Sequence, residues 1–183
     1  MNLGQERDEW LMGQAALGNR DCLEPLVRRY ANSLLTFIRR MVGDRQQSED
    51  LFQEVFLAVW KNRWQYQFPR PFKAWLYAIA LNQCRAAQRR RAPGPLDEKL
   101  SSTPASPDPS PAETAIATET AALVTAAVAR IAPQQRAVVV LRVWDGLSYS
   151  EIAEILGRSE GTVRSNMHHG LAAMRKYLEP RLG

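Results

Sequence analysis

Apolar positions recur every three or four residues along most of the chain, which is the spacing of amphipathic helices. No segment alternates apolar and polar residues for long enough to suggest a sheet, so the fold class predicted is all-α. The expected helices are residues 8–17, 21–42, 48–62, 71–91, 113–131, 134–144, 149–156 and 160–178. A β-branched run from Val138 to Leu141 would also fit a strand. Pro133 before it and Gly146 after it favour a short buried helix instead.

The helical pattern is interrupted between residues 92 and 115. This segment holds six of the eleven prolines and no aromatic residue, so it cannot bury enough apolar surface to offset the entropy cost of ordering. We therefore expect a flexible linker there, joining two small helical domains at residues 1–91 and 116–183.

Charge and cysteine content narrow the function classes. The net charge of +5 favours an anionic partner, although it also fits a basic protein without one. Cys22 and Cys84 lack metal-binding spacing, and the adjacent His168 and His169 point apart on a helix, so we expect neither a metal nor a cofactor. The N-terminus lacks the apolar region of a signal peptide, and no stretch is long enough to span a bilayer. We expect a cytoplasmic protein with no membrane insertion.

The sequence "LSYSEIAEILGRSEGTVRS", which begins at Leu147, predicts a helix-turn-helix. Ser148 and Glu151 have the spacing of a capping box at the start of the first helix. Gly157 suits a left-handed helix end, and Ser159 can cap the second helix. The apolar stripe expected on the second helix comprises Val163, Met167, Leu171, Met174 and Leu178.

The other side of this second helix carries short polar and cationic side chains, which suit the major groove of DNA. The candidate DNA-contacting residues are Ser159, Thr162, Arg164, Ser165, His168 and Lys176. A plain helical hairpin with a solvated polar face is the alternative interpretation. The capped turn and the "SEGTVRS" opening together favour DNA binding.

The stretch "SEDLFQEVFLAVW", residues 48–60, predicts a helix with two opposite faces. One face is an ordinary apolar core stripe. The other face carries Asp50, Gln53, Glu54 and Leu57. Like charges four residues apart weaken an isolated helix, so the two acids are either surface groups that complement the helix dipole or part of a face that docks on a basic partner.

Aromatic and cationic residues alternate in the loop 63–71 and the helix after it. This combination suits single-stranded nucleic acid, because bases need a stacking surface and phosphates need counter-charge. The apolar positions Phe72, Trp75, Leu76 and Ile79 share one helical face and are expected in the core. The candidate nucleic-acid contacts are Arg63, Phe68, Arg70, Asn82, Arg85 and Arg89.

The segments "SEDLFQEVFLAVWKN", "RPFKAWLYAIALNQ", "CRAAQRRRA" and "LSYSEIAEILGRSEGTVRS", in this order, resemble the extracytoplasmic-function group of bacterial sigma factors of the sigma-70 family. The resemblance covers both halves of the chain. It implies a sigma-2-like helical bundle at residues 1–91, which docks on core RNA polymerase and reads and melts the −10 element. It also implies a sigma-4-like helix-turn-helix domain at 116–183, which reads the −35 element and directs promoter-specific initiation.

The resemblance also implies roles for individual residues. Asp50, Gln53, Glu54 and Leu57 would meet the clamp helices of the polymerase β′ subunit. The loop 63–71 and the following helix would contact −10 DNA, and the helix after Ser159 would contact −35 DNA. Further implied partners are the β flap of polymerase and an anti-sigma factor.

Two other function classes fit parts of the sequence. A stand-alone helix-turn-helix transcription regulator would bind duplex DNA without needing the Asp50 and Glu54 face. An enzyme acting on nucleic acid would need clustered carboxylates, a nucleophile with its base, or a phosphate-binding glycine loop, and the sequence contains none of these motifs, so we do not expect an enzyme.

Overall fold

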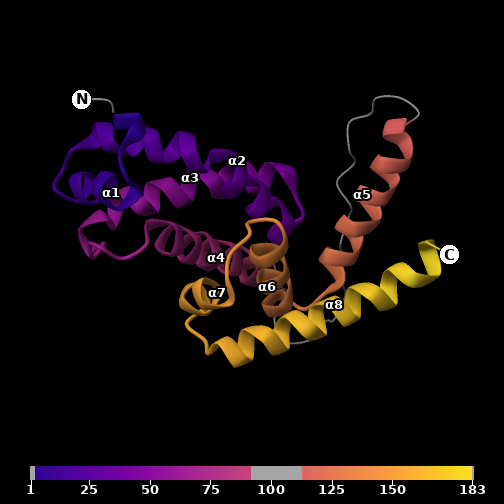
Figure 1. The fold of residues 1–183 in the computed structure, drawn as a ribbon. Helices are drawn as coiled ribbons and strands as arrows, with labels where there is room; N and C mark the ends of the chain where they lie inside the picture. Colours follow the sequence, from indigo (N-terminus) through magenta and orange to yellow (C-terminus); the bar gives the residue numbers. More distant parts are fainter. Residues whose placement is uncertain (1–2, 92–112, 183) are drawn as a thin grey trace.

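The computed structural model describes residues 3–91 and 113–182, and within these ranges every regular element is helical (Figure 1). The α-helices are α1 (Asp8–Ala16), α2 (Leu23–Val42), α3 (Arg45–Lys61), α4 (Phe72–Arg91), α5 (Glu113–Arg130), α6 (Pro133–Val143), α7 (Tyr149–Leu156) and α8 (Glu160–Leu182). The short 3-10 turns are η1 (Leu3–Gln5), η2 (Arg20–Cys22) and η3 (Arg63–Gln65). The all-α prediction is confirmed. Most of the predicted linker, residues 92–112, lies outside the described residues, and its last positions already belong to α5.

The first half is built on the long helix α2, which buries a continuous apolar face against α3 and α4 (Figure 1). The buried residues on this face are Leu26, Tyr30, Leu34, Phe37, Ile38 and Met41. Gly43 ends α2 in the left-handed conformation, with φ of 76°, and Asp44 starts α3 directly afterwards. The short turn lets α3 fold back along α2.

The second half packs α6 against α8 and α7, with α5 also lying against α8 (Figure 1). The run Val138–Leu141 is fully buried within α6, as the helical interpretation of this segment predicts. Gly170 of α8 lies so close to α6 that an added Cβ would be 2.8 Å from Cγ2 of Val139. This glycine therefore sets the distance between the two helices.

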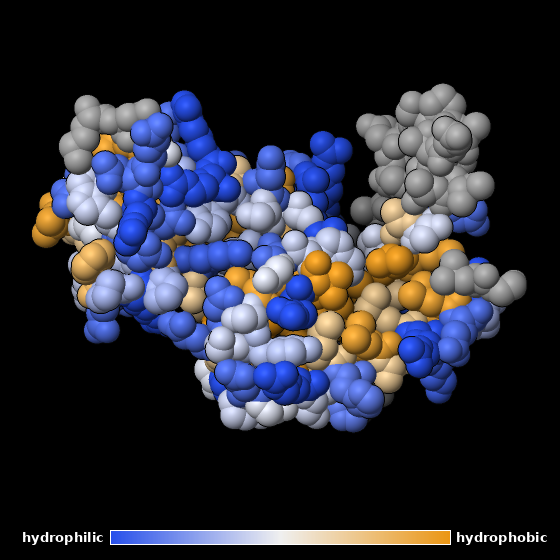
Figure 2. Space-filling model, viewed as in Figure 1, coloured by the Kyte–Doolittle hydropathy of each residue, from blue (hydrophilic) through white to orange (hydrophobic). Residues whose placement is uncertain are grey.

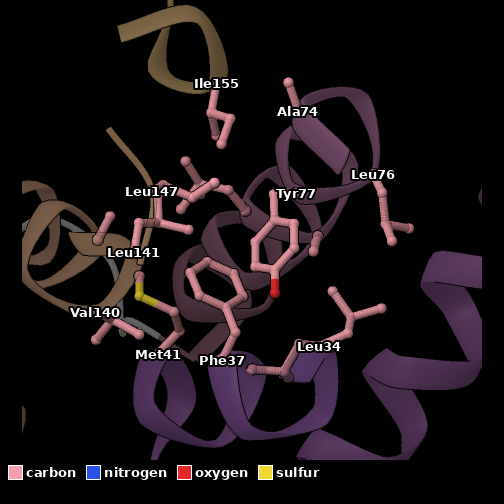
Figure 3. Packing of buried hydrophobic residues seen from close by; sticks show 14 of the residues in the cluster. Leu34, Phe37, Met41, Ala74, Leu76, Tyr77, Val140, Leu141, Leu147 and Ile155 are labelled. Carbon is pink, nitrogen blue, oxygen red and sulfur yellow. The ribbon is translucent and has the colours of Figure 1, made fainter. Parts of the chain in front are cut away.

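The two halves also share one hydrophobic core. Phe37 and Met41 of α2 and Tyr77 of α4 lie beside Leu141 of α6 and Leu147, which precedes α7 (Figure 3). At one edge of this contact, the guanidinium of Arg136 in α6 donates a hydrogen bond of 2.8 Å to the carbonyl oxygen of Met41. The sequence predicts two tethered units and gives no sign of this direct contact between them.

Candidate polymerase and nucleic-acid interfaces

The acidic face of α3 is exposed, as the sequence predicts. Asp50, Gln53, Glu54 and Leu57 all lie on the solvent side, and Leu57 has 57% of its surface exposed. The opposite side of the helix is buried in the core through Leu51, Val55 and Val59. We refer to Asp50, Gln53, Glu54 and Leu57 as the docking face.

The helix α3 begins three residues earlier than the sequence pattern predicts. Asp44 caps it, accepting a hydrogen bond of 2.7 Å from the backbone N–H of Gln47. Asp50 therefore lies in the second turn, where the helix dipole compensates its charge less than expected. Its contact within the chain is with the Gln46 amide, 3.5 Å away.

Neighbouring acids on α3 differ in how they are neutralised. Glu49 is within 3.2 Å of Arg45 and 3.3 Å of Arg39, so its charge is balanced inside the molecule. No described residue forms an ion pair with Asp50 or Glu54. Among the described residues, the two negative charges of the docking face thus have no ion-pair partner, and they lie beside an exposed leucine.

The loop 63–71 combines fixed and exposed aromatic groups. Tyr66 is buried, its hydroxyl donates to the carbonyl of Arg70, and its ring packs 5.3 Å from that of Trp75. Phe68 and Trp64 remain 64% and 69% exposed. The buried tyrosine anchors the loop, while the rings of Trp64 and Phe68 remain exposed to solvent.

Trp64 was not among the candidate contact residues predicted from the sequence. The sequence nevertheless contains the pattern that would have identified it, because Trp64 is an aromatic residue in a loop that also carries cations. Arg63, which was a candidate, is half-buried, and its guanidinium lies 3.9 Å from the centroid of the Trp60 ring and donates to the Trp60 carbonyl. Arg63 is therefore held against Trp60.

The predicted nucleic-acid contacts on and just before α4 have different surroundings. Asn82 and Arg89 are exposed. Arg85 is half-buried, and burial, followed by the charges of Arg158 and Arg89, lowers its guanidinium pKa. Arg70, just before the helix, forms a 3.1 Å ion pair with Glu154 of α7. Two of the predicted nucleic-acid contacts thus face the second half of the chain.

The helix-turn-helix has the local geometry that the sequence predicts. Ser148 and Glu151 form a reciprocal capping box at the start of α7, and Gly157 ends it with φ of 61°. Ser159 then caps α8 by accepting a hydrogen bond of 3.2 Å from the backbone N–H of Thr162. The end of α7 at Gly157 and the start of α8 at Ser159 are therefore both fixed, and together they set the direction in which α8 leaves the turn.

Most of the expected polar face of α8 is exposed to solvent. The exposed candidates are Ser159, Thr162, Arg164, Ser165, His168 and Lys176. The prediction that Leu171 belongs to the buried stripe is wrong, because its side chain is 46% exposed. The neighbouring Gly170 is buried instead, since its lack of a side chain brings α8 close to α6 at this point.

Arg164 is held by two contacts on the surface of α8. Its guanidinium lies 4.5 Å from the centroid of the Tyr149 ring and 3.2 Å from a carboxylate oxygen of Glu160. Arg142 lies 5.0 Å from the centroid of the same tyrosine ring. Tyr149 was not a candidate residue, and no signal in the sequence connects it to Arg164.

Each half of the chain matches a known protein family. The profile of sigma-70 region 2 matches residues 26–93, and that of sigma-70 region 4 matches residues 121–174. The chain is also 31% identical over 170 residues to the ECF RNA polymerase sigma factor SigL of Mycobacterium tuberculosis, which covers 90% of this chain and 93% of that protein. The chain belongs to the extracytoplasmic-function sigma factors of the sigma-70 family.

Two other relatives of this sigma factor differ in how much of their own length the chain spans. RNA polymerase sigma-H factor of Pseudomonas aeruginosa is 29% identical over 189 residues, covering 98% of both chains. ECF sigma factor SigE of Mycolicibacterium smegmatis is 37% identical over 168 residues, and the match covers 90% of this chain but 63% of that longer protein. In the described residues no helix is long and apolar enough to cross a membrane.

Among solved structures, CnrH in complex with the cytosolic domain of CnrY matches this sigma factor with a TM-score of 0.73 and 25% identity. The match covers 94% of this chain and 97% of that chain. RpoE in complex with the anti-sigma factor NepR from Bartonella quintana has the same fold, with a TM-score of 0.67, 20% identity and coverage of 86% and 96%. The fold similarity to these structures therefore extends over both halves.

Proposed function

We propose that this sigma factor binds core RNA polymerase through the docking face of α3 and directs initiation at promoters whose −10 and −35 elements it reads. The observation that carries the proposal is that Asp50 and Glu54, beside exposed Leu57, have no ion-pair partner in the part of the chain that the structure describes. A basic coiled coil, such as the β′ clamp helices that the family resemblance implies, would neutralise the acids and cover the leucine. The proposal places the protein in the cytoplasm, with polymerase, and assigns it no catalytic step.

The two DNA elements would meet different surfaces. We propose that the exposed aromatic residues of the loop 63–71 and the cations of α4 contact the opened −10 strand. The polar face of α8 would enter the major groove of the −35 element. The capped start of α8 and the exposure of Arg164 in its first two turns support this role.

A further proposed contact is an apolar surface between α5 and α8. Figure 2 shows hydrophobic residues gathered where these two helices approach each other. Among the apolar residues of these helices, Leu171 of α8 is exposed, and Val124 of α5 and Tyr177 and Leu178 of α8 are partly buried. This surface would suit the β flap of polymerase or an anti-sigma factor. The sigma factor RpoE, which has the same fold, is bound to the anti-sigma factor NepR in its solved structure, and this supports an inhibitor as a second partner here.

The docking face is tested by reversing its charges. Asp50→Lys/Glu54→Lys should weaken binding to core RNA polymerase at least about 30-fold, because losing one member of a desolvated charge pair costs about 2 kcal/mol or more. The helical circular-dichroism spectrum should not change, because both side chains are exposed and lack ion-pair partners among the described residues.

The matched control is Asp21→Lys/Glu24→Lys, which makes the same charge change at exposed positions outside α3. It should bind core polymerase as the unchanged protein does. Normal polymerase binding by the folded α3 variant would refute the docking face. A chain that binds promoter duplex but never polymerase would instead be a stand-alone regulator.

A further inference from the structure

The loop 63–71 ends where α4 begins, and the first backbone N–H of α4 is bonded by a residue of α1. The N–H of Phe72 donates to a carboxylate oxygen of Glu9 at 3.2 Å. The first turn of α4 contains no acidic residue of its own. The N–H groups at the start of a helix lack partners within it and carry partial positive charge, so a carboxylate stabilises that end. Glu9 therefore caps α4 from a different helix.

The same carboxylate lies near the buried anchor of the loop. The Tyr66 hydroxyl donates to the Arg70 carbonyl, and the centroid of its ring lies 6.4 Å from that of Phe72. Burial, followed by the charges of Glu9 and Asp8, raises the pKa of the Tyr66 hydroxyl, so it stays protonated and keeps donating. Glu9 and Tyr66 thus hold the last residues of the loop against the start of α4.

One turn after Glu9, α1 also approaches the side chain of Phe68. A Cβ added to Gly13 would be 4.0 Å from Cδ2 of Phe68, which is an ordinary van der Waals distance. Residues four apart share one face of a helix, so Glu9 and Gly13 both face the loop. Figure 1 shows α1 and the loop between α3 and α4 at the same end of the first half. One side of α1 therefore supports the loop, while Phe68 keeps 64% of its surface exposed.

Helix α1 is itself fastened to α2. The Asp8 carboxylate accepts hydrogen bonds from the Arg29 guanidinium and the Tyr30 hydroxyl. Arg29 also donates to the carbonyl of Glu6 at 3.1 Å. The residues of α1 that are buried in the core are Leu11, Met12 and Ala15. The support beneath the loop is thus a fixed element, which is what the precise placement of a binding side chain requires.

We propose that Glu9 is a positioning residue for the single-stranded DNA contact: by capping α4 it fixes where the loop 63–71 ends and how Phe68 presents its ring to an unpaired base. This inference rests on the proposed function for the identity of the partner. A ring that is already oriented loses less freedom when a base stacks on it, so binding is tighter. Glu9 acts through the loop, because its half-buried carboxylate is bonded to α4 and has the same sign of charge as a phosphate.

The sign of the effect separates positioning from electrostatics. Removing a negative charge close to a nucleic-acid surface by itself strengthens binding to phosphates. Removing the cap releases the end of the loop and weakens binding instead. Glu9→Ala and Glu9→Gln make the same charge change, but glutamine keeps a side-chain oxygen that can accept from the Phe72 N–H. The two variants therefore differ in the cap and not in charge.

Binding is measured on the full chain by fluorescence anisotropy with labelled oligothymidine, a single strand that has no base pairs to open. Glu9→Ala should bind it at least about threefold more weakly than Glu9→Gln, because the ring is no longer held for stacking. The control Glu24→Ala removes an exposed acid of α2 that pairs with Arg28 at 2.6 Å. This control should not weaken binding.

Combining Glu9→Ala with Phe68→Ala tests whether the effect passes through the ring. Phe68→Ala should weaken binding at least about fivefold, the lower end of what removing a base-stacking ring costs. In the Phe68→Ala background, Glu9→Ala should weaken binding no further. A merely structural role of Glu9 would lower affinity equally in both backgrounds and leave the two losses additive.

Gly13 provides a second test that leaves the cap intact. Gly13→Ala adds a methyl group at ordinary contact distance from Phe68 and should bind oligothymidine as the unchanged protein does. Gly13→Leu adds a side chain that must displace the ring, and it should weaken binding at least about threefold. Both substitutions replace glycine by a better helix former, so the helical circular-dichroism spectrum should be retained.

Equal affinities of Glu9→Ala and Glu9→Gln, or additive losses with Phe68→Ala, would overturn the positioning role. If Glu9→Ala does not fold, unchanged binding by Gly13→Leu overturns it instead. Absence of oligothymidine binding by the unchanged protein would refute the proposed −10 surface and this inference with it. Absence of core polymerase binding by the unchanged protein would refute the docking face alone, because Glu9 lies outside α3.

Discussion

Gly170→Ala tests how closely helix α8 packs against α6. The new Cβ would lie 2.8 Å from Cγ2 of Val139 and 3.4 Å from Cβ of Gln135. Carbon atoms pack best at about 3.5–4.0 Å, so the first contact is a clash. Val139 is fully buried, and a β-branched side chain in a helix has one preferred rotamer, so its methyl group has no alternative position.

The expected effect combines two opposing terms. Overpacking a core costs about 1–3 kcal/mol, and replacing glycine by alanine inside a helix contributes about 1 kcal/mol in favour of folding. Gly170→Ala should therefore lower the free energy of unfolding by up to about 2 kcal/mol. Gly161→Ala on the same helix is the control, because its nearest atom is the Ser159 hydroxyl oxygen at 3.9 Å and no clash arises.

A double-mutant cycle identifies the clash itself. Val139→Ala removes two buried methyl groups and should cost about 2 kcal/mol or more on its own. In Val139→Ala/Gly170→Ala the new methyl group occupies the space that was vacated. The double variant should be more stable than the sum of the single effects by about 1–3 kcal/mol.

The free energy of unfolding of the unchanged protein, the two single variants and the double variant is measured by urea unfolding followed by circular dichroism. Additive effects of the two substitutions would show that Gly170 and Val139 are not in contact. A Gly170→Ala variant more stable than the unchanged protein would refute the overpacking of this site.

Three further predictions concern individual side chains. Arg164→Ala should weaken binding to a duplex carrying the −35 element by about 1–3 kcal/mol, measured by fluorescence anisotropy, whereas Arg175→Ala should have little effect. Burial raises the pKa of the Cys84 thiol to about 12, so Ellman's reagent should modify Cys84 only after unfolding in urea. Burial also raises the pKa of the Asp145 carboxyl, against the lowering effects of Tyr77, Lys73 and Arg40. The folded chain should then bind a proton at Asp145 more tightly than the unfolded chain, so the free energy of unfolding should fall as the pH rises through the raised pKa, and Asp145→Asn should remove this dependence.

The sequence predicted the helices well because their ends carry explicit signals. Ser148, Glu151 and Gly157 each perform the capping role that their spacing indicates. The start of α3 was placed too late because Arg45, Gln46 and Gln47 after the Asp44 cap are all polar and extend no apolar stripe. Helix ends are thus predictable where a cap directly precedes the periodic apolar residues.

Contacts between residues far apart in the sequence could not be predicted from the spacing of apolar residues. Leu171 has the spacing of a core residue, yet the close approach at Gly170 leaves it exposed. Asp145 and Arg136 look like ordinary surface charges in the sequence, and their roles depend on Tyr77 and the Met41 carbonyl more than 60 positions earlier. Periodicity describes which side of a helix faces a core, but it contains no information on which other helix supplies that core.

The stacking of Arg164 on Tyr149 has a consequence for how promoter preference could change. A free arginine side chain loses about 2 kcal/mol of rotamer entropy when it is fixed. Part of that loss has already occurred in the protein, because the tyrosine ring and Glu160 restrict the guanidinium before any DNA arrives. Replacing Tyr149 should release the arginine, so under the proposed −35 contact of Arg164 the preference among promoters should shift through a residue on α7 that was not itself a candidate DNA contact.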